Sequence, residues 1–301
     1  MRLATIRTPA GERLHVRGLS GYVDLAAATG DEQLVSLEGL LAGGTSALGA
    51  AEAAMSQGGR EVALADFAAA VPNAGRVLCL GLNYGDHARE TGWQAADWPE
   101  SFVRGKRSII GPYDALIKPA LSSEFDFEGE LGVVIGRGGR YIPGEKAFEA
   151  VLGFTVLNEA SARDWQRAGK QWTPGKNFDF TMPLGPDIVT PDEVDVADLG
   201  LTTTLNGTVM QTGRTSEMLV SAAQSIEFFS SFTTLQPGDV IATGTPAGVG
   251  FTRKPPVYLE PGDIVEVTIE AIGTIRNLVI AEPNAPEDWP WVPRRATSGV
   301  L

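Results

Sequence analysis

Glu124-Phe-Asp-Phe-Glu-Gly-Glu-Leu-Gly-Val-Val-Ile135 has the pattern of one long β-strand. Side chains in a strand point to opposite faces in turn, so the odd positions form one face, which is apolar except at Gly129. The other face begins with four acids, Glu124, Asp126, Glu128 and Glu130. Like charges close together on one strand face destabilise it unless water screens them or a cation bridges them. The pattern therefore leaves two interpretations, an acidic solvent-exposed face on an edge strand or a cation site.

A cation held by this face would be a hard one. Carboxylate oxygens suit Mg²⁺, Mn²⁺ or Ca²⁺, whereas zinc favours histidine and cysteine ligands. The next predicted strand ends at Leu157-Asn158-Glu159, so Glu159 is a candidate for a third carboxylate at the same site. Single acids are common at strand ends, and Glu159 alone does not decide between the two interpretations.

The composition is that of a globular protein with many strands and turns. The 301 residues are 43% hydrophobic and 20% charged, and 36 glycines with 19 prolines indicate frequent turns. The formal net charge of −13 argues against binding nucleic acid, because phosphate contacts need a basic surface. An acidic protein that acts on an anion must supply local positive charge, and a bound cation is one source of it.

Membrane association and secretion are not expected from the sequence. No apolar run is long enough to cross a bilayer, and the N-terminal residues lack the apolar core of a signal peptide. The single cysteine, Cys79, lies between two leucines and is predicted to be a core residue rather than a nucleophile. Because one cysteine cannot form an intrachain disulfide, the predicted location is the cytoplasm.

The chain is predicted to consist of two parts that meet at a turn. Residues 1–71 form a small N-terminal α/β domain, and residues 72–301 form a strand-rich domain that begins at the Pro- and Gly-containing break 71–75. Apart from the segment quoted above, strands are expected near residues 115–119, 151–157, 200–205, 239–243 and 264–280.

Two further segments have recognisable patterns. Over residues 215–232, apolar residues recur at three- and four-residue spacing, which predicts an amphipathic helix. The segment after Glu282 is rich in proline and contains Trp289 and Trp291. Because tryptophan is seldom left in water, this segment is predicted to be an extended arm that packs on its own chain or on a partner subunit.

The sequence resembles the fumarylacetoacetate hydrolase family over roughly residues 76–281. The resemblance rests on a set of short motifs that occur in the family's order. They are Gly81-Leu-Asn-Tyr-Gly-Asp-His-Ala-Arg-Glu90, Asp126-Phe-Glu-Gly-Glu-Leu-Gly-Val-Val-Ile135, Gly153-Phe-Thr-Val-Leu-Asn-Glu-Ala-Ser-Ala-Arg-Asp-Trp-Gln166, Gly175-Lys-Asn-Phe-Asp179, Pro183-Leu-Gly-Pro186, Asn206-Gly207 and Asp239-Val-Ile-Ala-Thr-Gly-Thr-Pro-Ala-Gly-Val-Gly250. These motifs are specific for the family and much less so for the reaction.

The resemblance implies a fold and a metal site. The implied fold is α+β and β-rich, a mixed β-roll or barrel catalytic domain beside the small N-terminal domain. In the family, two glutamates on one strand and an aspartate on the next bind Mg²⁺ or Mn²⁺, which points to Glu128, Glu130 and Glu159 here. Glu159 stands where an aspartate is usual, and its extra methylene leaves the metal's identity open, with Ca²⁺ as a further candidate.

His87 and Glu90 are candidates for a catalytic pair. Their spacing places them on one side of a helical turn, where a carboxylate can orient an imidazole and raise its basicity. From spacing alone, an exposed surface pair is the more frequent outcome. The resemblance favours a general base, because hydrolases of the family carry such a pair on a lid over the substrate.

Several other roles are implied only by the resemblance. Lys176 matches a catalytic lysine that contacts the substrate oxygens, and Gln166, Tyr84 and Thr245 match substrate-binding positions.

Arg163 and Asp164 are interpreted as a structural ion pair outside the site, while Arg104 and Ser108 are candidates for shaping specificity. The loop at 244–250 lacks the Gly-Lys-Ser/Thr ending of a P-loop, which excludes nucleotide phosphate binding of that type.

The implied function is metal-dependent hydrolysis of a carbon–carbon bond in a small 2-oxo acid or 1,3-diketone, with the metal stabilising the enolate that leaves. His87, oriented by Glu90, would activate the attacking water. One alternative is a decarboxylase, isomerase or hydratase of 2-oxo acids or diacids in aromatic catabolism, which needs no attacking water. Another is a ligand-binding homologue without turnover, for which the altered Glu159 is the main argument. The family also implies a homodimer.

Overall fold

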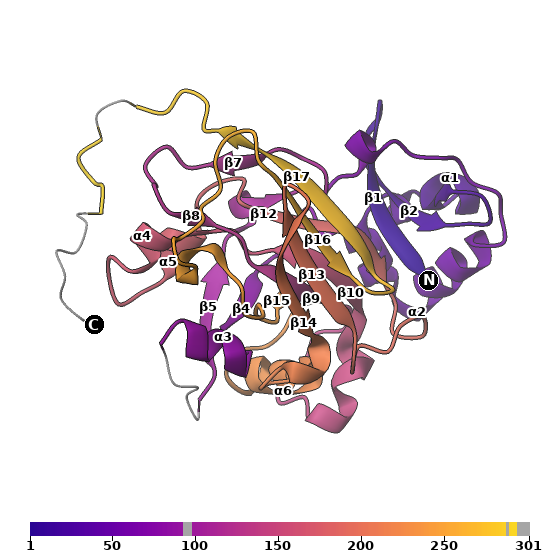
Figure 1. Cartoon of the computed structure of the whole chain (residues 1–301). Helices are drawn as coiled ribbons and strands as arrows, with labels where there is room; N and C mark the ends of the chain where they lie inside the picture. The colour runs from indigo at the N-terminus through magenta and orange to yellow at the C-terminus, as the bar shows by residue number, and fades with distance from the viewer. Residues whose placement is uncertain (93–97, 287–288, 294–301) are drawn as a thin grey trace.

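The computed structural model describes residues 1–92, 98–286 and 289–293. Its largest element is a ten-stranded mixed sheet (Figure 1). From edge to edge the sheet contains β3 (Tyr22–Asp24), β2 (Gly11–Arg17), β1 (Arg2–Thr8), β12 (Met182–Val189), β10 (Val151–Asn158), β9 (Gly129–Ile135), β15 (Val240–Ala242), β4 (Val77–Gly81) and β5 (Glu100–Arg104), with β6 (Ile109–Ile110) paired to β12.

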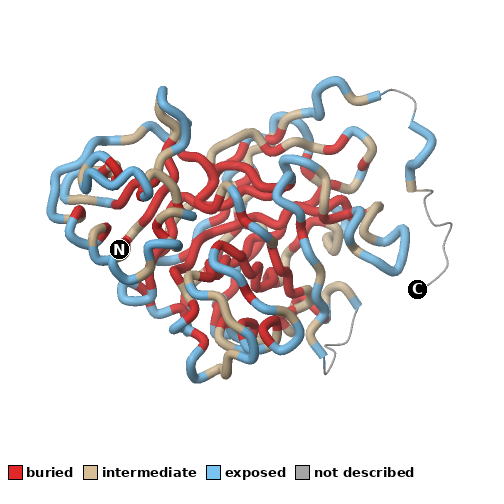
Figure 2. Tube along the Cα trace, turned by 180° about the vertical axis from the view of Figure 1, so that it is seen from behind, coloured by how far each residue is buried: buried red, intermediate tan, exposed pale blue. Residues whose placement is uncertain are grey.

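A five-stranded sheet packs against the middle of the first one. It contains β14 (Thr208–Arg214), β13 (Gly200–Leu205), β16 (Ile264–Ile269), β17 (Gly273–Ala281) and β7 (Leu116–Lys118). Apolar side chains from both sheets form one buried cluster, in which Leu131, Val133 and Phe154 meet Leu201, Val267 and Ile275. Figure 2 shows this buried centre, with exposed loops around it. The mixed, β-rich α+β fold that the resemblance implies is confirmed.

Helix α2 has 18 residues, and its Leu40, Ala47 and Ala51 belong to the buried cluster of the large sheet, whereas the other α-helices have four to eleven residues (Figure 1). The α-helices are α1 (Leu25–Thr29), α2 (Leu37–Ala54), α3 (Gly85–Glu90), α4 (Arg163–Gln166), α5 (Thr173–Lys176) and α6 (Ala222–Phe232). The 3₁₀ turns are η1 (Glu32–Val35), η2 (Leu64–Asp66), η3 (Lys106–Ser108), η4 (Gly144–Ala150), η5 (Thr215–Glu217) and η6 (Gly250–Thr252). Among the described residues, no helix has both the length and the hydropathy of a membrane span.

The amphipathic helix is shorter than the predicted 215–232. Helix α6 begins after Ser221, whose hydroxyl accepts a hydrogen bond from the Gln224 N–H, while the Gln224 side chain accepts one from the Ser221 N–H. This reciprocal cap ends the extended segment before the helix. The apolar spacing extends the prediction about two helical turns too far toward the N-terminus, into the separate turn η5.

The strand expected over residues 125–135 is interrupted, so that prediction was partly wrong. Its first part, β8 (Phe125–Asp126), pairs with β11 (Ser161–Ala162), and its second part is β9. At the break, side chains take the backbone donors: Asn158 Oδ1 accepts from the Glu128 N–H and Gln211 Oε1 accepts from the Gly129 N–H. A Cβ on Gly129 would lie 2.3 Å from Thr203 Oγ1, so only glycine allows the second sheet this close.

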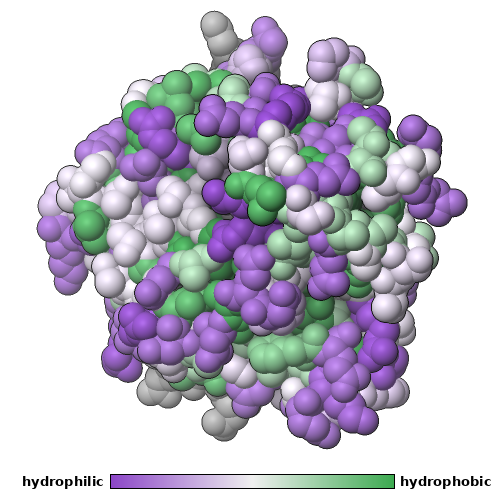
Figure 3. Space-filling model, turned by 90° about the vertical axis from the view of Figure 1, so that its right-hand side faces the viewer, coloured by the Kyte–Doolittle hydropathy of each residue, from purple (hydrophilic) through white to green (hydrophobic). Residues whose placement is uncertain are grey.

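The N-terminal segment extends the large sheet. Strand β1 pairs with β12, and β2 and β3 continue the sheet outward. On the side of the molecule where this segment lies, hydrophilic and hydrophobic residues are interspersed over the surface (Figure 3). The domain boundary near residue 71 stays a prediction.

Trp289 and Trp291 are not buried against the described part of their own chain. Their exposed fractions are 51% and 76%. The remaining expectation for this arm, contact with a partner subunit, is untested, and residues 287–288 and 294–301 of the arm lie outside the described residues.

Asp187 on β12 makes the stability of the fold depend on pH. Its carboxyl is buried and accepts a hydrogen bond of 2.8 Å from the Tyr22 hydroxyl, and burial raises its pKa to about 6. A raised carboxyl pKa gives stability that is complete below the unfolded-state pKa and is lost as pH rises through 6. We expect the free energy of unfolding to lose about 2 kcal/mol through this group between pH 4 and pH 7.

Asp187→Asn should remove that loss, since an amide is neutral throughout and can still accept from Tyr22. Urea unfolding at several pH values would measure the effect, with Asp195→Asn at an exposed carboxylate as the control. A stability difference between Asp187→Asn and the unmodified protein that stays constant from pH 4 to pH 7 would contradict the prediction.

Candidate functional site

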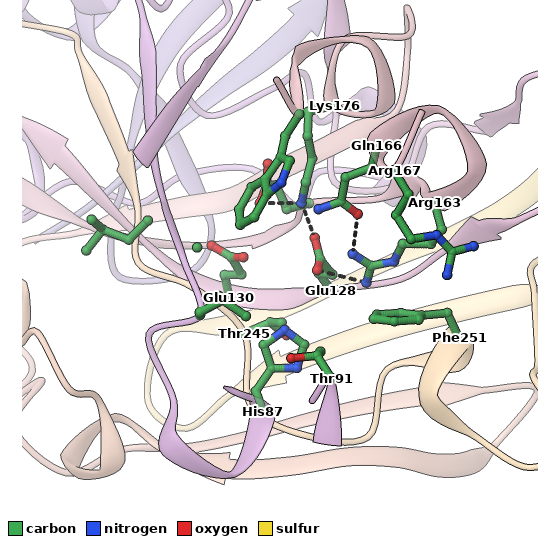
Figure 4. Close-up of a pocket in the computed structure, with 15 residues that line it drawn as sticks. His87, Thr91, Glu128, Glu130, Arg163, Gln166, Arg167, Lys176, Thr245 and Phe251 are labelled. Atoms are coloured by element: carbon green, nitrogen blue, oxygen red, sulfur yellow. Dashed lines mark hydrogen bonds and ion pairs between the residues drawn. The ribbon is translucent and has the colours of Figure 1, made fainter. Parts of the chain in front are cut away.

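A cavity of about 190 Å³ opens where the ends of β4 and β9 meet the short helices α3, α4 and α5. Figure 4 shows the charged groups that point into it. It is lined by Leu80, Gly81, Leu82, His87, Thr91, Glu128, Glu130, Glu159, Arg163, Gln166, Arg167, Trp172, Lys176, Thr245 and Phe251.

Three carboxylates that line the cavity lie close together. Glu128 precedes β9, Glu130 lies within it, and Glu159 follows the neighbouring strand β10. Each residue offers an oxygen within 4.8 Å of the others, and their exposed fractions are 4%, 1% and 1%. The interpretation as an acidic solvent face is therefore excluded for these residues, and the three candidates predicted from the sequence do come together.

Cations of the chain surround two of the three carboxylates. Lys176 Nζ lies 2.5 Å from Glu128 Oε2 and 3.1 Å from Glu159 Oε2. Arg163 lies 2.8 Å from Glu128 Oε1, and Arg104 lies 3.5 Å from Glu159 Oε1. Burial alone would raise the pKa of Glu128, but the charges of Arg163 and Lys176 lower it, so this carboxylate is held ionised.

Glu130 has no ion-pair partner among the described residues. One of its oxygens accepts a hydrogen bond of 2.8 Å from the Gly244 N–H. Burial, together with the charges of Glu159 and Glu128, raises its pKa well above the usual range. A divalent cation fits this donor set, because it would be bound by hard carboxylate oxygens and would compensate the charge that Lys176 leaves unpaired.

Local structure explains how Lys176 reaches the carboxylates. Pro174 lies in the first turn of α5, where proline favours a helix start. At Gly175, a Cβ would meet the Gln166 backbone nitrogen at 2.4 Å and the Ala162 oxygen at 2.6 Å. A glycine at this position therefore lets α5 pack directly on α4, which brings the following lysine into the cavity.

The two remaining acids of residues 124–135, Asp126 and Glu124, have structural roles outside the cavity. Asp126 is fully buried and accepts hydrogen bonds from the Gly250 and Phe251 N–H groups and from Arg163 Nε, so it ties the 250–251 loop to α4. Glu124 forms an ion pair with Arg167 nearer the surface. Neither residue lines the cavity.

His87 and Glu90 are a buried hydrogen-bonded pair rather than an exposed one. His87 Nδ1 lies 2.8 Å from Glu90 Oε1, and the imidazole is 5% exposed. The Glu90 carboxylate also accepts from the Gly248 N–H and the Thr252 hydroxyl. Burial would raise the pKa of Glu90, but these hydrogen bonds and His87 lower it, so an ionised carboxylate holds the imidazole by Nδ1.

The three predicted substrate-binding residues have different positions. Gln166 lines the cavity and accepts a hydrogen bond of 2.9 Å from Arg163. Thr245 also lines it, held by hydrogen bonds to the Gly129 carbonyl and from Gln211. Tyr84 is completely buried and does not line the cavity, so the structure does not place its hydroxyl where a substrate would touch it.

Sequence reasoning missed Arg163 and misplaced Arg104. Arg163 was interpreted as the partner of Asp164, but it pairs with Asp126 and Glu128, while Asp164 accepts from Ser122. The sequence did offer one indication that Arg163 belongs to the site, namely its position four residues after Glu159. Arg104 is fully buried beside Glu159, and Ser108 bonds the Gly105 carbonyl outside the cavity, so neither lies where it would contact a ligand directly.

Comparisons with known proteins agree with this fold. The family model described as fumarylacetoacetate (FAA) hydrolase C-terminal matches residues 76–280. The oxaloacetate tautomerase FAHD2A, mitochondrial, of Bos taurus is 48% identical over 217 residues, which are 71% of this chain and 69% of that protein.

Two solved structures are similar over nearly the whole chain. A putative HpcE protein from Mycobacterium smegmatis has a TM-score of 0.87 and 35% identity, covering 93% of this chain and 99% of its own. The fumarylacetoacetate hydrolase EaFAH from Exiguobacterium antarcticum has a TM-score of 0.79 and 35% identity, covering 94% and 100%.

The two packed mixed sheets, with a carboxylate-lined cavity between their ends and the short helices, have the fold of these similar enzymes. The chain belongs to the fumarylacetoacetate hydrolase family. Members that are similar to it carry isomerase, tautomerase and hydrolase names, so membership establishes the class of enzyme and leaves the reaction to be inferred from the site.

Proposed function

We propose that this chain catalyses the keto–enol tautomerisation of a small 2-oxo dicarboxylic acid, with oxaloacetate as the reference substrate. The observation that carries the proposal is the placement of a histidine base and a buried ammonium group around one carboxylate cluster (Figure 4). The 48% identity to a protein named as an oxaloacetate tautomerase supports the choice of substrate.

Glu128, Glu130 and Glu159 are the residues that would hold a divalent metal, Mg²⁺ or Mn²⁺ before Ca²⁺. When bound, such a cation supplies Lewis-acid polarisation of adjacent substrate oxygens. Arg104 and Lys176 each pair with one oxygen of Glu159 and hold its carboxylate in place.

His87 is the proposed proton-transfer group. Because Nδ1 faces the ionised Glu90, Nδ1 carries the ring proton and Nε2 is left as the basic atom. During ketonisation, Nε2 removes the proton of the enol hydroxyl group and the same imidazolium then delivers it to the adjacent carbon. The O–H bond breaks, a C–H bond forms and the double bond moves from C=C to C=O, so no proton is gained or lost overall. Thr91 lines the same part of the cavity.

Lys176 is proposed to stabilise the enolate oxygen. Burial would lower the pKa of this ammonium group, but Glu128 and Glu159 raise it, so the group stays charged at neutral pH. A fixed positive charge in a site that excludes water stabilises a developing anion more strongly than the same charge in water. His87 and Lys176 thus act on opposite sides of Glu128 (Figure 4).

The assay that tests this function follows the loss of ultraviolet absorbance when freshly dissolved enol-oxaloacetate ketonises in the presence of Mg²⁺. We expect the protein to accelerate the loss, and chelation of the metal to remove the acceleration. A rate equal to that of buffer with Mg²⁺ alone would contradict the proposal. Pyruvate formation, measured in parallel, would identify decarboxylation instead.

Hydrolysis of an acylpyruvate or fumarylpyruvate is the second candidate. The His87–Glu90 pair favours it, because an oriented imidazole is suited to activate water. Cleavage releases two acids and abolishes the diketone absorbance, whereas tautomerisation leaves the carbon skeleton intact. Product analysis therefore separates the two candidates.

Location and assembly stay predictions. The homodimer and the cytoplasmic location both come from sequence reasoning, and the tautomerase of Bos taurus is named as mitochondrial. No role is proposed for nucleic acid or membrane partners.

A further inference from the structure

The outer part of the cavity carries a second group of charges beside the carboxylate cluster. Arg163 and Arg167 follow one another by one helical turn, at the start and just past the end of α4. Both guanidinium carbons lie over the ring of Phe251, at 4.5 and 5.6 Å from its centre. In Figure 4 the two guanidinium groups lie beside each other, on the other side of Glu128 from Glu130.

Two cationic side chains of the cavity, Arg163 and Lys176, are buried and form ion pairs with buried carboxylates. Arg163 is 3% exposed, and its nitrogens lie 2.9 Å from Asp126, 2.8 Å from Glu128 and 2.9 Å from Gln166. Lys176 is 2% exposed and lies between Glu128 and Glu159. Taking Arg163 away would leave buried Asp126 without an ion pair among the described residues, and taking Lys176 away would remove one of the two cations that pair with each of Glu128 and Glu159, so both changes are unfavourable.

Arg167 is different because it lines the same cavity and is also open to solvent. Its side chain is 50% exposed, and its ion-pair partner among the described residues is Glu124, whose side chain is 20% exposed. An ion pair at the surface contributes little to stability. A carboxylate in the cavity can therefore replace Glu124 on this guanidinium at small cost, while the Phe251 ring keeps the group over the cavity.

We propose that Arg167 binds the second carboxylate of the substrate and thereby makes the site selective for dicarboxylic over monocarboxylic 2-oxo acids. The inference rests on the proposed function for the 2-oxo acid end of the substrate, which faces the carboxylate cluster. The far end of a 2-oxo diacid carries one more negative charge, and a planar guanidinium matches a carboxylate with two parallel hydrogen bonds.

The test compares two ligands of equal chain length. Oxaloacetate ends in a carboxylate where 2-oxobutyrate ends in a methyl group, so they differ at the end that Arg167 is proposed to bind. Their dissociation constants would be measured in Mg²⁺ buffer by quenching of tryptophan fluorescence, since Trp172 lines the cavity. We expect the unmodified protein to bind oxaloacetate more tightly than 2-oxobutyrate.

Arg167→Gln should weaken oxaloacetate binding about tenfold, the loss expected for a charge-assisted hydrogen bond at a partly exposed site, and leave 2-oxobutyrate unchanged. Glu124→Gln should strengthen oxaloacetate binding, because it frees Arg167. Arg107→Gln is the matched control: Arg107 also pairs with a surface carboxylate, Asp179, and lies over a phenylalanine ring, but it does not line the cavity.

Loss of affinity for both ligands in Arg167→Gln, or for neither, would overturn the inference, as would weaker oxaloacetate binding in Glu124→Gln. Absence of oxaloacetate binding in the unmodified protein would overturn it too. Fluorescence quenching reports binding and does not depend on turnover, so the inference can hold in a protein that lacks tautomerase activity. Conversely, a tautomerase whose Arg167→Gln variant binds both ligands normally keeps the proposed function and loses this inference.

Discussion

Glu128→Gln should abolish metal binding and reduce the stability of the metal-free protein. The change removes one of three ligand carboxylates, and we expect Mg²⁺ or Mn²⁺ affinity to fall at least about 100-fold, since loss of even an outer-shell partner costs 10- to 100-fold. It also removes one of the two carboxylates with which each of Lys176 and Arg163 pairs, and leaves Glu159 and Asp126 as their remaining partners. Breaking a buried pair in this way should lower the free energy of unfolding by about 3 kcal/mol.

Glu130→Gln is the matched variant for this experiment. It should weaken metal binding as strongly, yet cost the chelator-treated protein no stability, because Glu130 has no cationic partner among the described residues and its bond from the Gly244 N–H can be accepted by an amide oxygen. Calorimetric titration with Mg²⁺ and urea unfolding in the presence of a chelator measure the two effects separately. Metal binding by both variants at the affinity of the unmodified protein would end the assignment of the site.

Replacing Glu128 is expected to destabilise the metal-free protein and replacing Glu130 is not, and this difference could not be predicted from the sequence. Alternation along residues 124–135 was enough to put Glu128 and Glu130 together, and strand order along the chain was enough to nominate Glu159. Which carboxylate has which partner depends on Lys176 and Arg163, which lie on two other elements. A sequence pattern predicts the spacing of residues along one element, but it does not predict contacts between elements that are far apart in the chain.

The break between β8 and β9 has a cause of the same kind. Residues 124–131 alternate throughout except at Gly129, and the one local bond at the break among the described residues is that from the Phe127 N–H to Asp126 Oδ1. The strand stops because Asn158 and Gln211, on other strands, take the N–H groups of Glu128 and Gly129. By contrast, the cap that begins α6 is local, and the Ser221 and Gln224 pair could have been recognised from the sequence as the helix start.

His87→Asn should lower the rate of tautomerisation by about 100- to 10,000-fold, the range for loss of a general base, with little change in KM. The Asn amide can still donate toward Glu90, so α3 keeps its place while the basic Nε2 atom is lost. His15→Asn is the control, because His15 is a buried histidine of β2 outside the cavity, and its replacement should leave kcat unchanged. An equal kcat for His87→Asn and the unmodified protein would exclude His87 as the proton-transfer group.

Glu90→Gln separates the orienting role from the basic one. A glutamine oxygen can still accept from the Gly248 N–H, but its amide then presents a donor to His87 Nδ1. The imidazole would move its proton to Nε2 to accept that bond, which removes the base without removing the histidine. We therefore expect kcat for Glu90→Gln to fall toward that of His87→Asn, and the double variant to be no slower than His87→Asn alone, because the two residues act as one unit. Independent, multiplicative losses would show instead that Glu90 acts through the 248–252 loop that it also binds.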